Sequence, residues 1–416
     1  MAEQHEKALV PQIRFTGFTD PWEQRKLGEV ARRVTRKNEN GDSDLPLTIS
    51  AQYGLVDQRT FFNSQVASKD MSGYFLLHRG EFAYNKSTST DSPWGAIKRL
   101  EKYDMGCVST LYICFELLSG DPDFLVTYYE TDRWYKSVQL IAAEGARNHG
   151  LLNIAPDDFF ETQICIPKRI DEQRRIGAFF DRLDSLITLH QRKYDKLCVL
   201  KKSMLDKMFP KGGSLYPEIR FAGFTDPWEQ RKLEDYVVVS TAKNVDGRFN
   251  KEDVLSVSGE YGIVNQIAFQ GRSFAGSSVL NYGIVNTGDI VYTKSPLNSN
   301  PYGIIKVNKG IPGIVSTLYA VYRPQDNVHT NFIQVYFEQH ERMNNYMHPL
   351  VNKGAKNDMK VTAENALKGV VTFPSREEQV IISEFFDRLD SLITLHQRKL
   401  ELLRNIKKSM LDKMFV

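Results

Sequence analysis

The sequence predicts an α+β protein built as a tandem duplication, in which each unit is a compact α+β domain followed by one long helix. The stretch FFDRLDSLITLHQRK occupies residues 179–193 and recurs letter for letter at 385–399. Each copy lies in a long run without proline whose apolar residues recur at three- and four-residue spacings, which indicates a helix. The regions between these runs mix short strand-like segments with glycine turns, which indicates a domain of helices and strands.

Further repeats show that the whole chain is one unit written twice. The block IRFTGFTDPWEQRKL at 13–27 returns with one change at 219–233, and KKSMLDKMF at 201–209 returns unchanged at 407–415. Shorter matches occur in the same order between these blocks: YGLV and YGIV, YNKS and YTKS, PWGAIK and PYGIIK, GCVSTLY and GIVSTLY, GARN and GAKN. The two units therefore share a fold, and their middles have diverged.

The repeats also set the expected domain boundaries. Pro210 and the pair Gly212-Gly213 end the first long helix and join it to the second unit. Within each middle, a helical pattern is expected at 122–142 and at 331–347. The expected segments are an N-terminal segment at 1–27, a domain at 28–168, a long helix at 169–210, a linker and repeated segment at 211–233, a second domain at 234–374 and a second long helix at 375–416.

The long helices are expected to pack on each other as an antiparallel coiled coil, giving a pseudo-twofold molecule. At a rise of about 1.5 Å per residue, residues 171–209 would span roughly 58 Å. Apolar residues recur with a period of 3.5, which is typical of a coiled-coil seam. The expected seam residues are Phe179, Leu183, Leu186, His190, Lys193 and Leu197 in the first helix and Phe385, Leu389, Leu392, His396, Lys399 and Leu403 in the second.

Two polar layers are expected to set the register of this coil. Matching polar residues pairs His190 with Lys399 and Lys193 with His396, because a buried polar group opposite Leu would lack a partner. Two interpretations of the histidines stay open: a tolerated core residue, or a residue that controls register. A metal site is not expected, since no second His or carboxylate in the seam has ligand spacing.

Composition and absent motifs limit the functions that the chain can have. With 41% hydrophobic and 25% charged residues and a net charge of +3, the chain is an ordinary globular protein that permits a polyanionic partner without requiring one. Cys107, Cys114, Cys165 and Cys198 form no C-x-x-C pair, and no apolar run is long enough to span a membrane, so a reduced, cytoplasmic protein is expected. No nucleotide-binding, methyltransferase or hydrolase motif is present, so no catalytic residue is predicted.

Polar loops at matched places in the two middles are the candidate DNA-binding sites. Arg can bind guanine, Asn can bind adenine, and Lys or Ser can bind a phosphate. A plain solvated loop is the alternative for each of these residues. The candidates are Asn85, Lys86, Ser87, Arg147 and Asn148 in the first unit and Lys294, Ser295, Lys356 and Asn357 in the second.

Taken in order, these motifs resemble the specificity (S) subunit of type I restriction–modification enzymes. The resemblance is carried by GFTDPWEQRKL at both unit starts, YNKS and YTKS, GxVSTLY, DEQRRIGAFFDRLD at 171–184 and EEQVIISEFFDRLD at 377–390. It covers essentially the whole chain.

The resemblance implies that each middle is a target recognition domain for one half of a bipartite, adenine-containing DNA target. The helices would hold the domains apart and bind two copies of a methyltransferase (M) subunit. S-adenosylmethionine would bind to the M subunits, and ATP and Mg to the restriction (R) subunits, so this chain would hold no cofactor and perform no catalysis. The alternatives are a stand-alone tandem-domain DNA-binding regulator and a coiled-coil scaffold that does not bind DNA.

Overall fold

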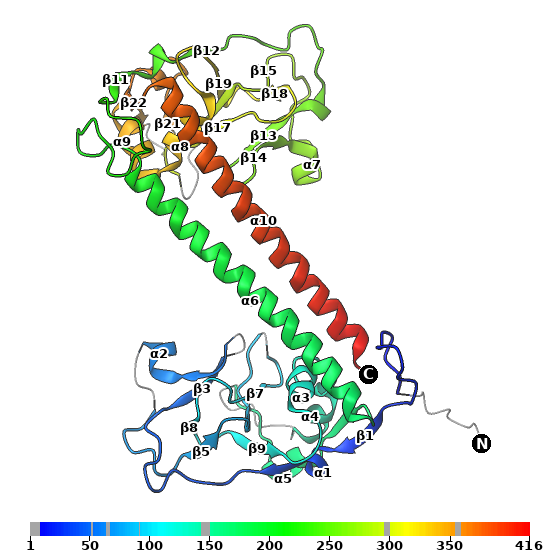
Figure 1. Ribbon diagram of the computed structural model, residues 1–416. Coiled ribbons are helices and arrows are strands. Elements are labelled where there is room, and N and C mark those ends of the chain that lie inside the picture. Colours follow the sequence, from blue (N-terminus) through cyan, green and yellow to red (C-terminus); the bar gives the residue numbers. More distant parts are fainter. Residues whose placement is uncertain are drawn as a thin grey trace. The chain divides into compact units, whose positions relative to one another are not determined.

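The computed structural model describes residues 9–50, 53–63, 67–90, 92–142, 150–294, 300–353 and 359–416. The chain divides into two compact units, one formed by Met1–Gln191 with Arg398–Val416 and the other by Arg192–Gln397. Each unit contains an α+β domain and a part of both long helices (Figure 1). The structural unit therefore differs from the sequence repeat, because each unit includes the end of a helix that belongs to the other repeat.

The first unit is built on a four-stranded antiparallel sheet. Its strands lie in the order β2 (Ala31–Arg33), β9 (Ile113–Leu117), β6 (Phe82–Asn85) and β7 (Ala96–Arg99). Alternate residues of β6 and β9 face the core, where the rings of Phe82 and Phe115 stack with centroids 5.1 Å apart. Three two-stranded pairs complete the strands: β5 (Phe75–His78) with β8 (Met105–Val108), β3 (Leu47–Ser50) with β4 (Gly54–Asp57), and β1 (Glu23–Lys26) with β10 (Gln163–Ile166).

Short helices cover this sheet. The segment expected to be helical at 122–142 forms α3 (Pro122–Tyr128) and α4 (Tyr135–Ile141), separated by a turn. The start of α3 is fixed by Pro122 at its first position and by the carboxylate of Asp121, which accepts hydrogen bonds from two backbone amides of the first turn. The other short helices are α1 (Leu27–Val30), α2 (Gln58–Phe62) and α5 (Pro156–Phe160).

The second unit repeats this plan with different residues. Its sheet has the order β12 (Val237–Val239), β19 (Tyr319–Pro324), β16 (Ile290–Thr293) and β17 (Ile305–Val307). The paired strands are β15 (Gly283–Val285) with β18 (Gly313–Val315), β13 (Leu255–Ser258) with β14 (Gly262–Asn265), β11 (Glu229–Lys232) with β22 (Val370–Phe373), and β20 (Asn352–Lys353) with β21 (Met359–Lys360). The helices are α7 (Gln266–Gln270), α8 (Thr330–Glu338), α9 (His340–Met347) and the short 3-10 turns Leu233–Asp235, Lys251–Asp253, His348–Leu350 and Asn365–Leu367.

The two long helices, α6 (Ile170–Lys207) and α10 (Arg376–Met414), confirm the predicted helices. In the first unit the start of α6 packs against the end of α10: Lys407 bonds to Asp184, and Arg404 donates to Gln191 further along α6. The residue numbers rise along one helix as they fall along the other, so the pairing is antiparallel, as predicted (Figure 1).

One of the two predicted seam positions of each helix is displaced by one residue, while the other is kept. Leu186 and Leu392 are each 44% exposed, and Lys193 and Lys399 are exposed, so none of these four is a seam residue. Lys193 and Lys399 therefore do not form buried polar layers, and their pairing with His396 and His190 stays a prediction. The residues that follow these positions are less exposed. The buried ones are Phe180 in α6, Met208 just after α6, and Phe386, Leu400 and Met414 in α10. The partly buried ones are Ile187, Tyr194 and Lys201 in α6 and Ile393 and Lys407 in α10.

The remaining expected seam residues differ in their burial and in their contacts. Leu183 and Leu389 are buried, and Leu197 and Leu403 are partly buried against the cores of their units. Phe179 packs on Phe15, with ring centroids 5.9 Å apart, and thus contacts the N-terminal segment of the same unit. Phe385 makes the corresponding contact with Phe221 at 5.8 Å. His190 and His396 are partly buried.

The identical sequence blocks form the joints between each domain and the helices. In the first unit Arg14 donates two hydrogen bonds of 2.6 and 2.7 Å to the buried carboxylate of Glu172 near the start of α6. In the second unit Arg220 binds Glu378 of α10 in the same way, at 2.8 and 2.7 Å. Such bidentate pairs are directional as well as strong, so they orient each repeated segment on a helix.

The repeated Met-Phe pair at the end of each helix enters a domain core. Phe415, at the end of α10, lies in the core of the first unit, with its ring centroid 5.6 Å from Phe124. Phe209, beyond the end of α6, lies in the core of the second unit at 5.8 Å from Phe332. Each helix end thus belongs to the core of the unit in which it terminates.

Candidate nucleic-acid interface

The first group of predicted DNA-binding residues follows β6. The side chain of Asn85 accepts a hydrogen bond from the backbone amide of Ser87 at 3.0 Å, which closes a turn directly after the strand. Ser87 forms a bridge with Leu151, and the amide of Thr88 donates to the carbonyl of Gly150 at 2.7 Å. The turn is therefore held against residues 150–152, and the Ser87 side chain is exposed at its edge.

Lys86 is oriented differently from a solvated lysine. Its Nζ donates to the backbone carbonyl of Ile154 at 3.2 Å, and the side chain is partly buried. Burial lowers the pKa of Lys86, because desolvation disfavours the charged ammonium. The amine therefore supports the turn in this structure, and its role as a phosphate contact stays a prediction.

The glycine of the repeated P-x-G-x-I-K block explains how this turn can form. Gly95 has a φ of +81°, and a Cβ atom at this position would overlap the carbonyl oxygen of Asn85. Gly303 has a φ of +76°, and a Cβ there would overlap the carbonyl oxygen of Thr293. The hydroxyls of Tyr84 and Tyr292 donate to the carbonyls of Trp94 and Tyr302 beside these glycines, at 2.8 and 2.9 Å. The same close approach of a glycine to the end of a strand is thus found at β6 and at β16.

In the second unit, Lys294 follows β16 at the place that Lys86 takes after β6. Its backbone amide donates to the carbonyl of Leu318, in the repeated V-S-T-L-Y block, at 3.4 Å. The Leu318 side chain is 64% exposed, so this block reaches the surface beside Lys294. The structure therefore brings Lys294 and the V-S-T-L-Y block close together.

The other predicted contacts lie outside the described residues. These are Arg147 and Asn148 in the first unit and Ser295, Lys356 and Asn357 in the second. All of them stay predictions.

An exposed aromatic cluster in each unit was missed by the sequence reasoning. On the β3–β4 hairpin, Tyr53 is 56% exposed, and the ammonium of Lys102 is 5.7 Å from its ring. On α2, the exposed rings of Phe61 and Phe62 lie 5.0 Å apart. The β13–β14 hairpin and α7 carry Tyr261, which is 59% exposed, with its ring 5.6 Å from Phe269. The signal was present in the match between YGLV and YGIV. Aromatic rings next to cations are suited to stacking on nucleic-acid bases.

The long helices carry exposed leucines at equivalent positions. Leu186 and Leu189 of α6 are 44% and 46% exposed, and Leu392 and Leu395 of α10 are 44% and 45% exposed. All four lie within the stretch that the two units share without change. Equal apolar surfaces on identical sequence are suited to two copies of one protein partner.

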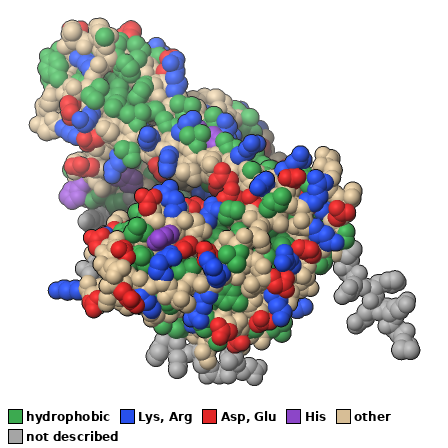
Figure 2. Space-filling view, turned by 60° about the horizontal axis from the view of Figure 1, so that its bottom comes forward, with side chains coloured by type: hydrophobic (Ala, Val, Ile, Leu, Met, Phe, Trp, Pro, Cys, Tyr) green, Lys and Arg blue, Asp and Glu red, His purple; other side chains and the backbone are tan. Residues whose placement is uncertain are grey.

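Charge is mixed over the surface. On the face shown in Figure 2, Lys and Arg side chains are interspersed with Asp and Glu, in keeping with the small net charge. Within the described ranges, no group of three or more His, Cys, Asp or Glu residues is placed to hold a metal ion. No helix in that part of the chain is long and apolar enough to cross a membrane.

Comparisons with known proteins show what this chain is similar to. Residues 225–405 match the family model described as the type I restriction modification DNA specificity domain. The fold is similar to the crystal structure of a type-I restriction-modification system S subunit from M. genitalium, with a TM-score of 0.58, 13% identity, and coverage of 98% of this chain and 99% of that one.

Two further solved structures are similar at lower scores. One is a chain from work on complex assembly and conformational transition of the type I R-M system, with a TM-score of 0.44, 16% identity and coverage of 95% and 97%. The other is the HsdS subunit from Thermoanaerobacter tengcongensis, with a TM-score of 0.41, 18% identity and coverage of 96% and 98%.

Proposed function

We propose that this chain is a specificity subunit of a type I restriction–modification system. It would read a bipartite, adenine-containing DNA target with one recognition domain for each half. The observation that carries this proposal is the duplication of one fold, of which the second copy matches the model of the DNA specificity domain. The elements and joints are repeated in both units, while the residues around the candidate contact turns differ. Different surfaces on one scaffold are what two different half-sites require.

The candidate contacts are the turns after β6 and β16. The exposed hydroxyl of Ser87 can bind a phosphate oxygen, and Lys294 can bind a phosphate or a base edge. Arg147, Asn148, Ser295, Lys356 and Asn357 are retained as proposed contacts. The exposed aromatic clusters around Tyr53 and Tyr261 would add stacking that does not depend on sequence.

A domain exchange tests the division of labour between the two units. Residues 28–168 are replaced by the equivalent domain of a relative, and methylated adenines are mapped in cells that contain the partner subunits. One half of the motif is expected to change while the other half and the spacer persist. A motif in which both halves change together would contradict the proposal of two independent readers.

The chain would perform no catalysis and hold no cofactor of its own. S-adenosylmethionine would be used by two methyltransferase subunits that methylate adenine N6, and ATP with Mg by restriction subunits. The exposed leucines Leu186 and Leu189, with Leu392 and Leu395, are the proposed docking surfaces for the two methyltransferase copies. Their equal exposure and identical sequence context support this assignment.

Substitution of these leucines tests the docking surfaces. Leu189→Lys in α6 and Leu395→Lys in α10 are each expected to reduce the number of methyltransferase subunits bound from two to one, and the double variant to bind none. Native mass spectrometry of the co-purified complex measures the ratio. Leu140→Lys, at a position that is 80% exposed on α4, is the matched control. A full complement of partners on the double variant would remove these leucines from the interface.

The helices are also proposed to set the spacer between the half-sites. Gln191 and Gln397 are the residues at which the chain passes from one unit to the other. Four residues inserted after each would lengthen both helices by roughly 6 Å at about 1.5 Å per residue. With about 3.4 Å per base pair, the preferred spacer should lengthen by one or two base pairs. An unchanged spacer in the methylated motif would refute the role of the helices as a ruler.

A further inference from the structure

A partly buried lysine in the second unit joins three elements at one point. The Nζ atom of Lys201, on α6, lies 2.7 Å from Glu338 at the end of α8 and 2.6 Å from Asp390 on α10. The Lys201 side chain is only 14% exposed. Lys306 of β17 is buried, and its charge interacts with those of Glu338, Lys201 and Asp390. One ammonium therefore bonds to the recognition domain and to the opposing helix together.

The first unit contains the same arrangement. The Nζ atom of Lys407, on α10, lies 2.8 Å from Glu130, just after α3, and 2.6 Å from Asp184 on α6. Lys98 of β7 lies 3.6 Å from the other oxygen of Glu130. The four residues of one unit match the four of the other in the alignment of the repeats. We call these groups the two lysine joints: Lys201 with Glu338 and Asp390, and Lys407 with Glu130 and Asp184.

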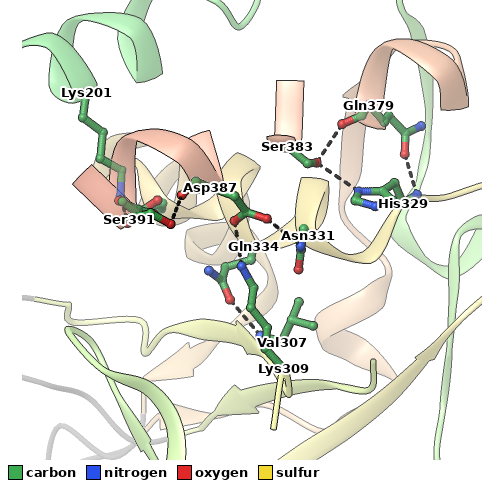
Figure 3. Close-up of polar contacts among 12 residues, drawn as sticks. Lys201, Val307, Lys309, His329, Asn331, Gln334, Gln379, Ser383, Asp387 and Ser391 are labelled. Atoms are coloured by element: carbon green, nitrogen blue, oxygen red, sulfur yellow. Dashed lines mark hydrogen bonds and ion pairs between the residues drawn. The ribbon is translucent and has the colours of Figure 1, made fainter. Parts of the chain in front are cut away.

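The contacts around the two joints are not repeated in the same way. In the second unit, Lys309 bonds to Asp387 at 2.7 Å and Asn331 donates to the same carboxylate at 2.9 Å, next to the pair of His329 and Gln379 (Figure 3). In the first unit, Arg99 instead bonds to Glu101 and Asp123 within the recognition domain. The lysine joint persists where its charged neighbours have changed, so it has a role that both recognition domains share.

We propose that Lys201 and Lys407 are positioning residues that fix each recognition domain on the helix pair and thereby determine the selectivity for spacer length. This inference rests on the proposed function of reading a bipartite target. An ammonium with three donors can hold one carboxylate of the domain and one of the opposing helix in a defined direction. A domain held only by apolar contacts could shift along the helices at little cost, because apolar contacts are not directional.

Replacing Lys201 should remove the ion pairs of its lysine joint without creating a cavity in the apolar core. Without Lys201, Glu338 and Asp390 would face each other as two partly buried carboxylates, and Oε2 of Glu338 already has no hydrogen-bond partner among the described residues. The two negative charges of Glu338 and Asp390 would repel each other, so the second recognition domain should move away from α10. The half-site would then be presented over a wider range of distances.

The test examines both joints, with an exposed neighbouring lysine as the control. Lys201→Met is assembled with the methyltransferase subunits, and methylation is measured on duplexes whose spacer is native or changed by one base pair. The preference for the native spacer is expected to fall by about tenfold, within the range of coupling between contacting residues. Lys202→Met, one residue away and exposed, should keep the preference. Lys407→Met should have the same effect as Lys201→Met.

A charge exchange separates positioning from a general loss of stability. In Lys201→Asp with Asp390→Lys, the new lysine can still bond to Glu338 and to the new aspartate, so spacer selectivity is expected to return. Single Asp390→Lys should lack it. If Lys201→Met folds and keeps the wild-type preference, or if the exchange fails to restore it in a folded complex, the proposal is overturned. A wild-type complex that methylates no bipartite motif would instead refute the proposed function.

Discussion

The substitution Phe415→Ala, just after the end of α10, should destabilise the first unit. Phe415 is 3% exposed and packs on Trp22, Phe124 and Phe180, with centroids 5.9, 5.6 and 6.0 Å away. Phe→Ala in a core costs about 3–5 kcal/mol, through lost contacts and the cavity that remains. For a unit of this size, about 2–4 °C of Tm is lost per kcal/mol, so Phe415→Ala should lower the Tm of the first unit by roughly 6–20 °C.

Hydrogen exchange read by peptide distinguishes the two units. In Phe415→Ala, amides around Phe124 should exchange faster, while those around Phe332 in α8 should keep more of their protection. Phe209→Ala should give the reverse pattern, because Phe209 packs on Phe332. Leu402→Ala, at a position 60% exposed on α10, is the control and should change neither. A Phe415→Ala protein that loses protection around Phe332 but not around Phe124 would refute the assignment of the helix end to the first unit.

Two further predictions concern the turns and the lysine joints. Gly95→Ala should abolish reading of the first half-site and Gly303→Ala of the second, since each new Cβ overlaps a backbone carbonyl, whereas Gly73→Ala, with open space around it, should be neutral in methylation mapping. Burial lowers the pKa of Lys201 and Lys407, but their carboxylate partners outweigh it, so the folded-state pKa of each lysine is raised. This stabilisation is present below the unfolded pKa of about 10.4 and lost as the pH rises through the folded value. The unfolding free energy of the wild type should therefore fall more steeply above about pH 10.4 than that of the Lys201→Met, Lys407→Met double variant, and parallel curves would contradict the ion pairs.

The duplication made the architecture predictable from the sequence. Two sets of elements in the same order require one fold used twice, and a proline-free run with helical spacing requires a long helix, as α6 and α10 confirm. The seam was less predictable, because apolar residues stand next to each other at Phe179 and Phe180 and at Leu186 and Ile187. Whether Leu186 or Ile187 is placed between Leu183 and His190, the spacings alternate between three and four residues, so the average period is 3.5 in both cases. The N-terminal segment decides which residue is in the seam, because Phe15 packs on Phe179 while Phe180 lies in the core of the first unit.

The candidate contacts were predictable only in part. The position of Asn85 and Ser87 at a turn follows from the strand and the glycine block around them. The inward orientation of Lys86 depends on the carbonyl of Ile154, a partner distant in sequence that no local pattern reveals. Long-range partners of this kind also hid the lysine joints, since Lys201 and Glu338 belong to segments with no shared motif.

The near-identity of the repeated blocks follows from the exchange of helix ends between the repeats. The segment KKSMLDKMF of the first repeat ends in the core of the second unit, and its copy ends in the core of the first. Each copy packs in a core that is formed mainly by the other repeat. The two copies can therefore stay identical only if both cores keep the same residues around the Met-Phe pair. The same reasoning applies to Glu130 and Glu338, which each receive a lysine from the other repeat's helix. A recognition domain grafted between the helices should therefore need this glutamate and its aromatic receptor, whatever bases its turns contact.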